Sequence, residues 1–298
     1  MTSALLLKLF SSSSPRASTE SADKRRLTLR WSGTSTGMAL GPRASQCHHP
    51  SRGPSAIRLR PLSSNVRRHI TSMPIYDAAT YESELRKCTK CAPLLAQYQV
   101  DPPESPEAVL PRPIVRPLLP CPVMLIGQAP GLTEYRTGRP FSGPAGRDAR
   151  AIFVQAGLDD ARFERFVFTS AVAKCFPGSK LVPRRRTSGV RREDVKPSAE
   201  MLRNCSPFLL AQLNVVNPRT VVLLGKMALE VFLELTTGRR ASVQLDDYVG
   251  RLLEWNGRNV IPLAHTSGAS TWLNQPERKA LQQRAMQHLR EQLAEYAR

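Results

Sequence analysis

Four short apolar segments, each bounded by turn-forming residues, constrain the fold of this chain more than any other feature. They span residues 123–126, 166–173, 220–224 and 260–263. Helical patterns lie between and after them, at residues 145–156, 199–215, 226–235 and 275–296. Brief, continuous apolar strands that alternate with helices are typical of a parallel sheet covered on both faces. The sequence therefore predicts an α/β fold of three layers, in which helices flank a central, mostly parallel four-stranded sheet.

Residues 1–73 are not expected to join this fold. They contain 12 Lys and Arg against 2 Asp and Glu, with many serines and prolines. A segment of this composition cannot form a packed core, and an Arg-rich, Ser-rich, acid-poor start is typical of a transit peptide. We therefore predict a disordered leader and a mitochondrial location. A plain disordered tail, or an extension upstream of a true start at Met73, is the alternative, with the protein then in the nucleus or cytoplasm.

The predicted domain, residues 74–298, is basic in its own right. The chain has a net charge of +19, and this part contributes 31 Lys and Arg against 22 Asp and Glu. Such a charge favours a polyanionic partner. Part of it lies in a polar insertion at residues 178–197, which is either a solvated loop or an exposed phosphate-binding loop. The candidate phosphate contacts are Arg184, Arg185, Arg186, Arg191 and Arg192.

A proline-rich segment precedes the first predicted strand. Residues 102–122 contain eight prolines, which remove backbone donors and block helix formation. We expect an extended wrap over the surface of the domain. No segment approaches the roughly 18 apolar residues of a membrane helix, so a membrane partner is not expected.

Four of the six cysteines have positions that suit a metal centre. A helical pattern at residues 76–85 leads into a C-x-x-C pair, a third cysteine follows the second strand, and a fourth begins the next helix. These four are Cys88, Cys91, Cys175 and Cys205. Cys47, in the leader, and Cys121, in the proline-rich segment, are poorer candidates. Spacing alone leaves a redox motif, a zinc site and an iron–sulfur site open.

The glycine-rich segment 126–146, I-G-Q-A-P-G-L-T-E-Y-R-T-G-R-P-F-S-G-P-A-G, suggests a ligand-binding loop. It lacks the G-x-G-x-x-G pattern of a dinucleotide loop. It instead resembles the first motif of the uracil-DNA glycosylase superfamily, G-E/Q-x-P-G followed by an acidic residue and G-x-P-F-x-G-x-A-G. The second motif of that family, a strand ending in H-P-S, is similar to Ala264-His265-Thr266-Ser267. The four cysteines occur in the order of its iron–sulfur, thermophile-type branch.

The resemblance implies a monofunctional DNA-repair enzyme that flips uracil, or another deaminated base, out of single- or double-stranded DNA and hydrolyses its N-glycosidic bond. It implies a structural 4Fe–4S cluster on the four cysteines. His265 would stabilise negative charge at uracil O2, and Phe141 would stack on the base. Gln128 would orient the attacking water beside Ala129, while Glu134 would lie at the C5 edge.

Two positions depart from the family pattern. Ser170 stands nearest the place of an asparagine that reads the base edge, and Thr266 replaces the proline of H-P-S. The alternative is therefore a weak or inactive iron–sulfur DNA-binding protein of the same fold, and a redox carrier is a third reading. The basic insertion lacks the histidine that traps product in one branch of the superfamily, so no covalent adduct is expected.

Contacts with DNA are expected from two regions of a monomer. The arginines of the insertion would contact phosphates without reading sequence. Trp272, in the segment after His265, would wedge into the gap left by the flipped base, or else pack against the C-terminal helix.

Overall fold

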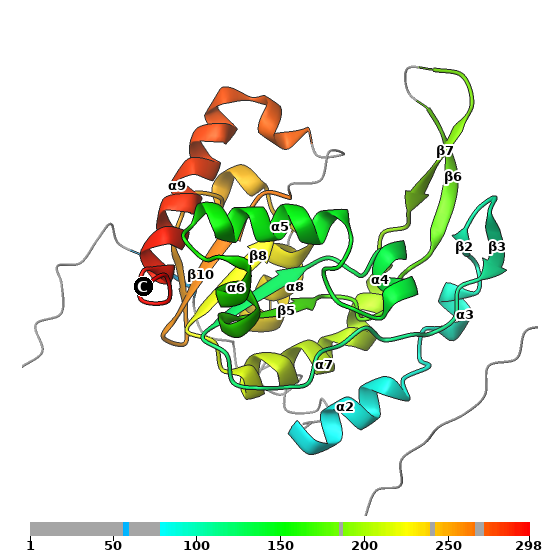
Figure 1. The fold of residues 1–298 in the computed structure, drawn as a ribbon, viewed down its shortest axis with the longest axis horizontal. Coiled ribbons are helices and arrows are strands. Elements are labelled where there is room, and N and C mark those ends of the chain that lie inside the picture. Colours follow the sequence, from blue (N-terminus) through cyan, green and yellow to red (C-terminus); the bar gives the residue numbers. More distant parts are fainter. Residues whose placement is uncertain (1–55, 60–77, 185–186, 239–241, 266–270) are drawn as a thin grey trace, which may run out of the picture. The chain divides into compact units, whose positions relative to one another are not determined.

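The computed structural model describes residues 56–59, 78–184, 187–238, 242–265 and 271–298. Its main sheet is mixed and has six strands in the order β1-β9-β10-β8-β4-β5 (Figure 1). The strands are β1 (Ile57–Arg58), β4 (Val123–Gly127), β5 (Val167–Ala171), β8 (Thr220–Leu224), β9 (Leu253–Trp255) and β10 (Arg258–Leu263).

The four predicted strands form the parallel centre of this sheet. β4 pairs with β5 and β8, and β8 pairs with β10, all in parallel. Every residue of β4 and β8 is buried, as a strand covered on both faces requires. The α/β prediction is thus confirmed, with the correction that the sheet has two further strands.

The two further strands extend the sheet beyond β10. β9 runs antiparallel to β10 through a turn at Asn256 and Gly257, both with positive φ (49° and 75°), a combination that tight hairpins favour. β1 pairs in parallel with β9. Residues 57–58 lie in the predicted leader, so the expectation of disorder does not hold for them. The rest of residues 1–55 and 60–77 lies outside the described part.

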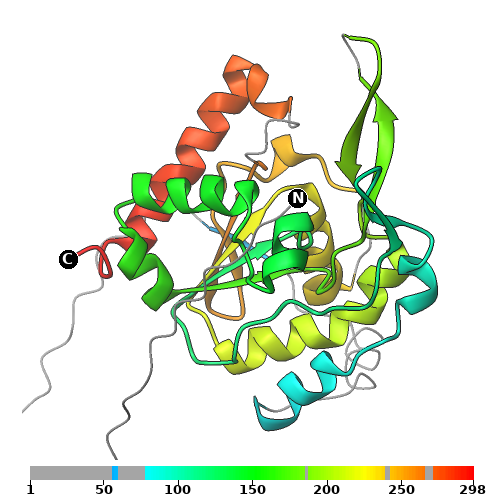
Figure 2. The ribbon, with the colours of Figure 1, turned by 45° about the vertical axis from the view of Figure 1, so that its right-hand side comes forward.

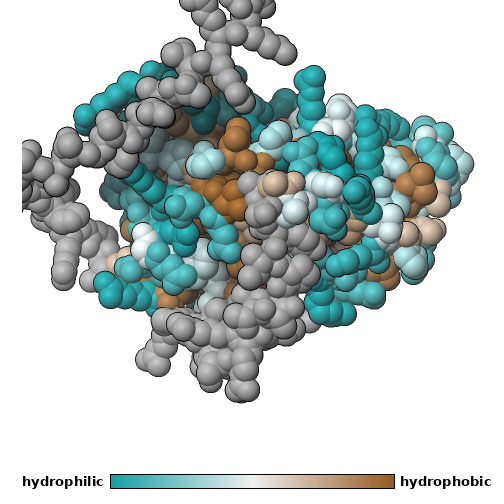
Figure 3. All heavy atoms as spheres, turned by 90° about the horizontal axis from the view of Figure 1, so that it is seen from below, coloured by the Kyte–Doolittle hydropathy of each residue, from teal (hydrophilic) through white to brown (hydrophobic). Residues whose placement is uncertain are grey.

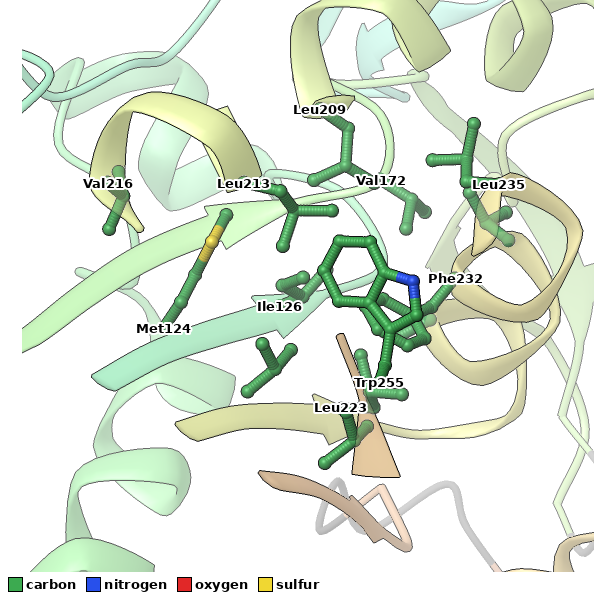
Figure 4. Packing of buried hydrophobic residues seen from close by; sticks show 14 of the residues in the cluster. Met124, Ile126, Val172, Leu209, Leu213, Val216, Leu223, Phe232, Leu235 and Trp255 are labelled. Carbon is green, nitrogen blue, oxygen red and sulfur yellow. The ribbon is translucent and has the colours of Figure 1, made fainter. Parts of the chain in front are cut away.

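Helices cover both faces of the sheet, as Figures 1 and 2 show. On one face, α2, α7 and α8 enclose a core in which side chains of β4, α7 and α8 meet around Trp255 (Figure 4). On the other, α5, α6 and α9 pack over β4, β8 and β10. The bounds are α2 (Ala78–Arg86), α5 (Pro144–Gln155), α6 (Asp160–Phe166), α7 (Ala199–Val216), α8 (Lys226–Thr237) and α9 (Pro276–Leu293).

A second, antiparallel sheet has the order β3-β2-β6-β7. Its strands are β2 (Gln99–Asp101), β3 (Ser105–Ala108), β6 (Ser179–Pro183) and β7 (Val190–Asp194). The basic insertion is therefore a β-hairpin rather than a loop, and Figure 1 shows it projecting beyond β2 and β3. The remaining short helices are α3 (Ala92–Leu95), α4 (Leu132–Thr137), η1 (Leu245–Asp247) and η2 (Trp272–Asn274).

The proline-rich segment is more than a surface wrap. After β3 it has no regular structure, yet Val109, Ile114 and Leu118 are buried. The amide of Ile114 donates to the carbonyl of Lys174 at 2.8 Å. On the face that Figure 3 shows, hydrophilic side chains are more numerous than hydrophobic ones. Among the described residues, no helix combines the length and apolarity needed to cross a bilayer.

Candidate active site

The carboxyl ends of two neighbouring strands, β4 and β8, approach the aromatic and the histidine predicted for the base pocket. β4 ends at Gly127, where a methyl group would lie 3.0 Å from Cζ of Phe141. β8 is followed by Gly225, where a methyl group would lie 3.2 Å from Cβ of His265. Paired strands are about 4.8 Å apart, so the Phe141 ring and the imidazole occupy neighbouring strand ends. Both glycines permit this approach because they have no side chain.

Phe141 itself has a strained backbone. Its φ of 54° is in the left-handed region, which costs a non-glycine residue about 1–2 kcal/mol. A methyl group on Gly146 would lie 1.9 Å from the carbonyl oxygen of Phe141, so only glycine fits beneath this turn. Strain of this kind persists where surrounding contacts fix it, and it is concentrated at functional sites.

Glu134 joins two turns of the active-site loop, which we define as residues 127–146. Its Oε1 accepts a hydrogen bond from the amide of Gly143 at 2.7 Å, and its Oε2 accepts one from the amide of Gly131 at 3.0 Å. The side chain is buried, with 8% of the residue exposed. The structure thus gives Glu134 a positioning role that the sequence did not show, while its contact with the C5 edge of the base stays a prediction.

Replacing Glu134 with glutamine is expected to lower the free energy of unfolding by about 1–3 kcal/mol, because an amide nitrogen would then face one of two buried N–H donors. Urea unfolding measures the change. Glu82→Gln is the matched control, since Glu82 pairs with Arg86 on the solvent-facing side of α2, where such a pair contributes about 0.5 kcal/mol or less. Equal effects of the two substitutions would contradict the positioning role.

Gln128 and Ala129 follow β4 and are half-buried. The amide of Val172 donates to the carbonyl of Gly127 at 2.9 Å, and the amide of Ala173 donates to that of Gln128 at 3.1 Å. These bonds join the segment after β5 to the active-site loop. The side chain of Gln128 therefore starts from a fixed backbone at the strand end, and its action on water stays a prediction.

His265 follows β10 and is half-buried. Burial lowers its pKa from the ordinary value of 6.5, against an opposing effect of the Asp148 carboxylate. The imidazole is therefore neutral at pH 7 and offers one N–H donor. The preceding amide, of Ala264, donates to Oε1 of Gln282 on α9 at 3.0 Å. Thr266 lies outside the described residues.

Ser170 is buried on the side of β5 that faces α7. Its hydroxyl donates to Oε1 of Gln212 at 2.5 Å and accepts from Nζ of Lys174 at 2.8 Å. Lys174 also donates to the carbonyl of Ala171 at 2.6 Å. The hydroxyl is thus engaged within the protein, and the predicted contact of Ser170 with the base stays a prediction.

Lys174 and Gln212 are the polar residues that the sequence reasoning missed. Lys174 is only 2% exposed, and its burial lowers its pKa to about 7. One signal was present in the sequence, because Gln212 interrupts the apolar run F-L-L-A-Q-L of α7. A polar residue at a core position normally has a buried partner.

The four predicted cysteines line one cavity, together with Pro111, Pro113 and Asn204. Cys88 is half-buried, the other three are buried, and all four are free thiols. They come from three places in the fold: the loop after α2, the segment after β5, and α7. Among the described residues, no Cys, His, Asp or Glu group has the spacing of a single-ion site.

The electrostatics of this cavity disfavour isolated thiolates. Burial raises the pKa of Cys205 to about 11 and also raises the pKa of Cys91 and Cys175. N–H donors nevertheless point at two of the sulfurs: Nδ2 of Asn204 is 3.5 Å from Sγ of Cys91, and the amide of Lys174 is 3.4 Å from Sγ of Cys205. Such donors are typical of iron–sulfur sites, where they tune the cluster.

Three of the predicted DNA-binding arginines, Arg184, Arg191 and Arg192, lie on the hairpin. Arg184 is exposed, with its Nε donating to the carbonyl of Val190 at 3.1 Å. Arg191 is exposed beside Glu193, at 2.5 Å. Arg192 is half-buried and pairs with Asp101 and Asp194. Arg185 and Arg186 lie outside the described residues. Phosphate contacts by all five stay predictions.

Trp272 packs on the protein. It lies in η2 and packs against the core that α5, α6 and α9 form with the sheet. The guanidinium of Arg278 is 5.5 Å from the centroid of its ring. Its buried Nε1 lacks a hydrogen-bond partner among the described residues. This position fits the packing alternative, and a wedge into DNA stays a prediction.

Comparison with known proteins supports one family. The model of the Uracil DNA glycosylase superfamily matches residues 117–290. The type-4 uracil-DNA glycosylase of Thermotoga maritima is 32% identical over 146 residues, which cover 49% of this chain and 64% of the relative. That of Pyrobaculum aerophilum is 33% identical over 129 residues, 43% of this chain and 56% of the relative.

A longer match is more distant. The type-4 uracil-DNA glycosylase of Saccharolobus solfataricus is 26% identical over 203 residues, which cover 67% of this chain and 79% of the relative. The matches with the Thermotoga and Pyrobaculum proteins span less than two thirds of those relatives.

Proposed function

This chain belongs to the uracil-DNA glycosylase superfamily, whose model matches more than half of it, and we propose that it releases uracil from DNA. In the proposed reaction, the bond between C1′ of the sugar and N1 of uracil breaks. Water supplies hydroxide to C1′ and a proton to the base. The products are free uracil and an abasic site.

The placement of Phe141 and His265 on neighbouring strand ends is the observation that carries this proposal. A flipped base needs an aromatic face for stacking and a donor for the charge that grows at O2. Phe141 supplies the face. His265, neutral because burial lowers its pKa, supplies the donor. The chain therefore presents both groups at a rigid edge of its sheet.

The water and the base edge are assigned to the residues around that pair. Gln128 orients the attacking water beside Ala129, from a backbone that the segment after β5 holds in place. Glu134 fixes the loop from within. Because Ser170 is engaged with Gln212 and Lys174, we assign little of the base recognition to its hydroxyl.

We propose a 4Fe–4S cluster as the cofactor. Cys88, Cys91, Cys175 and Cys205 share one cavity, and N–H donors face two of their sulfurs. The order of these cysteines along the chain resembles that of the iron–sulfur branch of the superfamily, which favours a cluster over zinc. When bound, the cluster would link the loop after α2, the end of β5 and α7, and would play a structural part.

To test the proposal, the protein is incubated with a uracil-containing oligonucleotide, single- or double-stranded, and the oligonucleotide is then treated with alkali. Strand breakage at the uracil position is the expected result, and substrates with hypoxanthine or xanthine establish the base preference. The absence of breakage on both forms of the uracil substrate would overturn the proposal. A thymine oligonucleotide of the same sequence is the control.

A second candidate function is a weak or inactive iron–sulfur protein that binds DNA. The observation in its favour is the engaged hydroxyl of Ser170, which stands nearest the base-reading asparagine of the family. This candidate predicts DNA binding in a gel shift without base release.

A further inference from the structure

The carboxylate of Asp101 bridges two arginines that belong to different parts of the fold. Its Oδ2 is 2.6 Å from Nη2 of Arg136 in α4, and its Oδ1 is 3.2 Å from Nε of Arg192 in β7. The side chain of Asp101 is only 14% exposed. α4 belongs to the active-site loop, whereas β7 belongs to the basic hairpin (Figure 1).

A second connection runs from the hairpin back to the same loop. Arg192 also pairs with Asp194, and its Nη1 donates to the hydroxyl of Ser179 at 2.8 Å. A methyl group on Gly131 would lie 3.1 Å from Oδ2 of Asp194. The base of the hairpin therefore lies against the turn before α4, at Gly131, and is linked to the helix through Asp101, which pairs with both Arg192 and Arg136.

α4 depends on these contacts for its position. It has six residues, and isolated helices shorter than about 12 residues are marginal in water. Glu134 holds it on one side by bonds to the two turns of the loop, and Asp101 holds Arg136 on the other. An isolated, exposed ion pair contributes little to stability. A partly buried carboxylate that pairs with two guanidinium groups forms a network, and networks are the exception to that rule.

We propose that Asp101 is a positioning residue that couples the hairpin to the active-site loop. Contact of the hairpin with DNA phosphates is thereby transmitted to the loop that carries Gln128 and Phe141. The coupling rests on the proposed function, because its expected consequence is faster base release when DNA is held by the hairpin. A purely stabilising Asp101 would instead change the unfolding temperature without linking the two regions.

The test is a double-mutant cycle on the full-length protein, with Asp101→Asn and Arg184→Gln alone and together. Single-turnover release from a uracil oligonucleotide is measured at saturating protein. We expect the Asp101→Asn protein to release uracil about tenfold more slowly than the wild type. The interaction free energy between residues of one ion-pair network typically corresponds to a rate change of about this size. Arg184→Gln should slow the wild type but have no further effect in the Asp101→Asn protein. Additive effects would overturn the proposal.

Affinity separates coupling from loss of structure. Neutralising Asp101 removes a negative charge from a basic region, so binding of the oligonucleotide should stay the same or tighten.

Glu164→Gln is the matched control, because Glu164 on α6 also pairs with two arginines, Arg116 and Arg150. This substitution should leave the rate of uracil release unchanged. An equal loss of rate in this control would refute a specific role of Asp101.

A second measurement does not depend on catalysis. Hydrogen exchange of the loop amides is compared with and without an oligonucleotide that contains no uracil, so that the hairpin can contact phosphates while no flipped base touches Phe141. DNA should slow exchange at residues 128–146 in the wild type but not in Asp101→Asn. If DNA slows exchange equally in both proteins, the coupling is refuted. If the wild type shows the coupling yet releases no base, the proposed function fails while the coupling stands.

Discussion

Replacing His265 with alanine is expected to lower the single-turnover rate of uracil release about 100-fold to 1,000-fold, the loss typical of removing one donor to a developing oxyanion. The imidazole is packed against Gly225 and is neutral at pH 7 because burial lowers its pKa. The substitution removes a hydrogen-bond donor whose interaction with uracil O2 is strongest in the transition state, when negative charge has grown on the base. Rapid-quench measurement with excess protein reports this step.

Binding should change little in the same variant. Phosphate contacts are assigned to the hairpin, which lies elsewhere in the fold, so the affinity for a uracil oligonucleotide should stay within about threefold of the wild type. His288→Ala serves as a control, because His288 lies on α9 beside Glu291. A His265→Ala protein that releases uracil at the wild-type rate would contradict the role assigned to His265, whereas binding without release in both proteins would support the inactive DNA-binding alternative.

Replacing Cys175 with serine is expected to remove the cluster and to lower the melting temperature by about 10 °C or more, because metal-binding free energy is also folding free energy. Cys175 is buried in the segment after β5, where Cys205 of α7 shares its cavity. Iron and acid-labile sulfide analysis, visible absorption and thermal unfolding together measure the effect.

Cys121 provides a matched control for the cysteine substitution. It is a half-buried free thiol in the proline-rich segment, near the carbonyl of Arg165 rather than in the cysteine cavity. Cys121→Ser should keep the full iron content and the visible absorption. Zinc without sulfide in the wild type, or full iron in Cys175→Ser, would contradict the cluster assignment.

The sequence was sufficient for the parallel centre of the fold. β4 and β8 are buried along their whole length, so they appear as uninterrupted apolar runs with turn residues on both sides. β9 was missed because it has only three residues, although the Asn256–Gly257 pair was a hairpin signal. The basic hairpin was missed because its polar, arginine-rich sequence resembles that of an exposed loop.

The candidate site was predictable to a smaller extent. Phe141 and His265 could be named from their motifs, and the structure brings them to neighbouring strand ends. The roles of Glu134 and Asp101 could not be read in this way. Glu134 acts on backbone amides, which every residue has, and Asp101 acts on arginines 35 and 91 positions away in the chain.

The most direct test of the account is mass spectrometry of the products from a defined uracil oligonucleotide and the wild-type protein. We expect free uracil and an abasic oligonucleotide in equal amounts, with no protein–DNA adduct on a denaturing gel. An oligonucleotide that binds the protein yet keeps its uracil would contradict it.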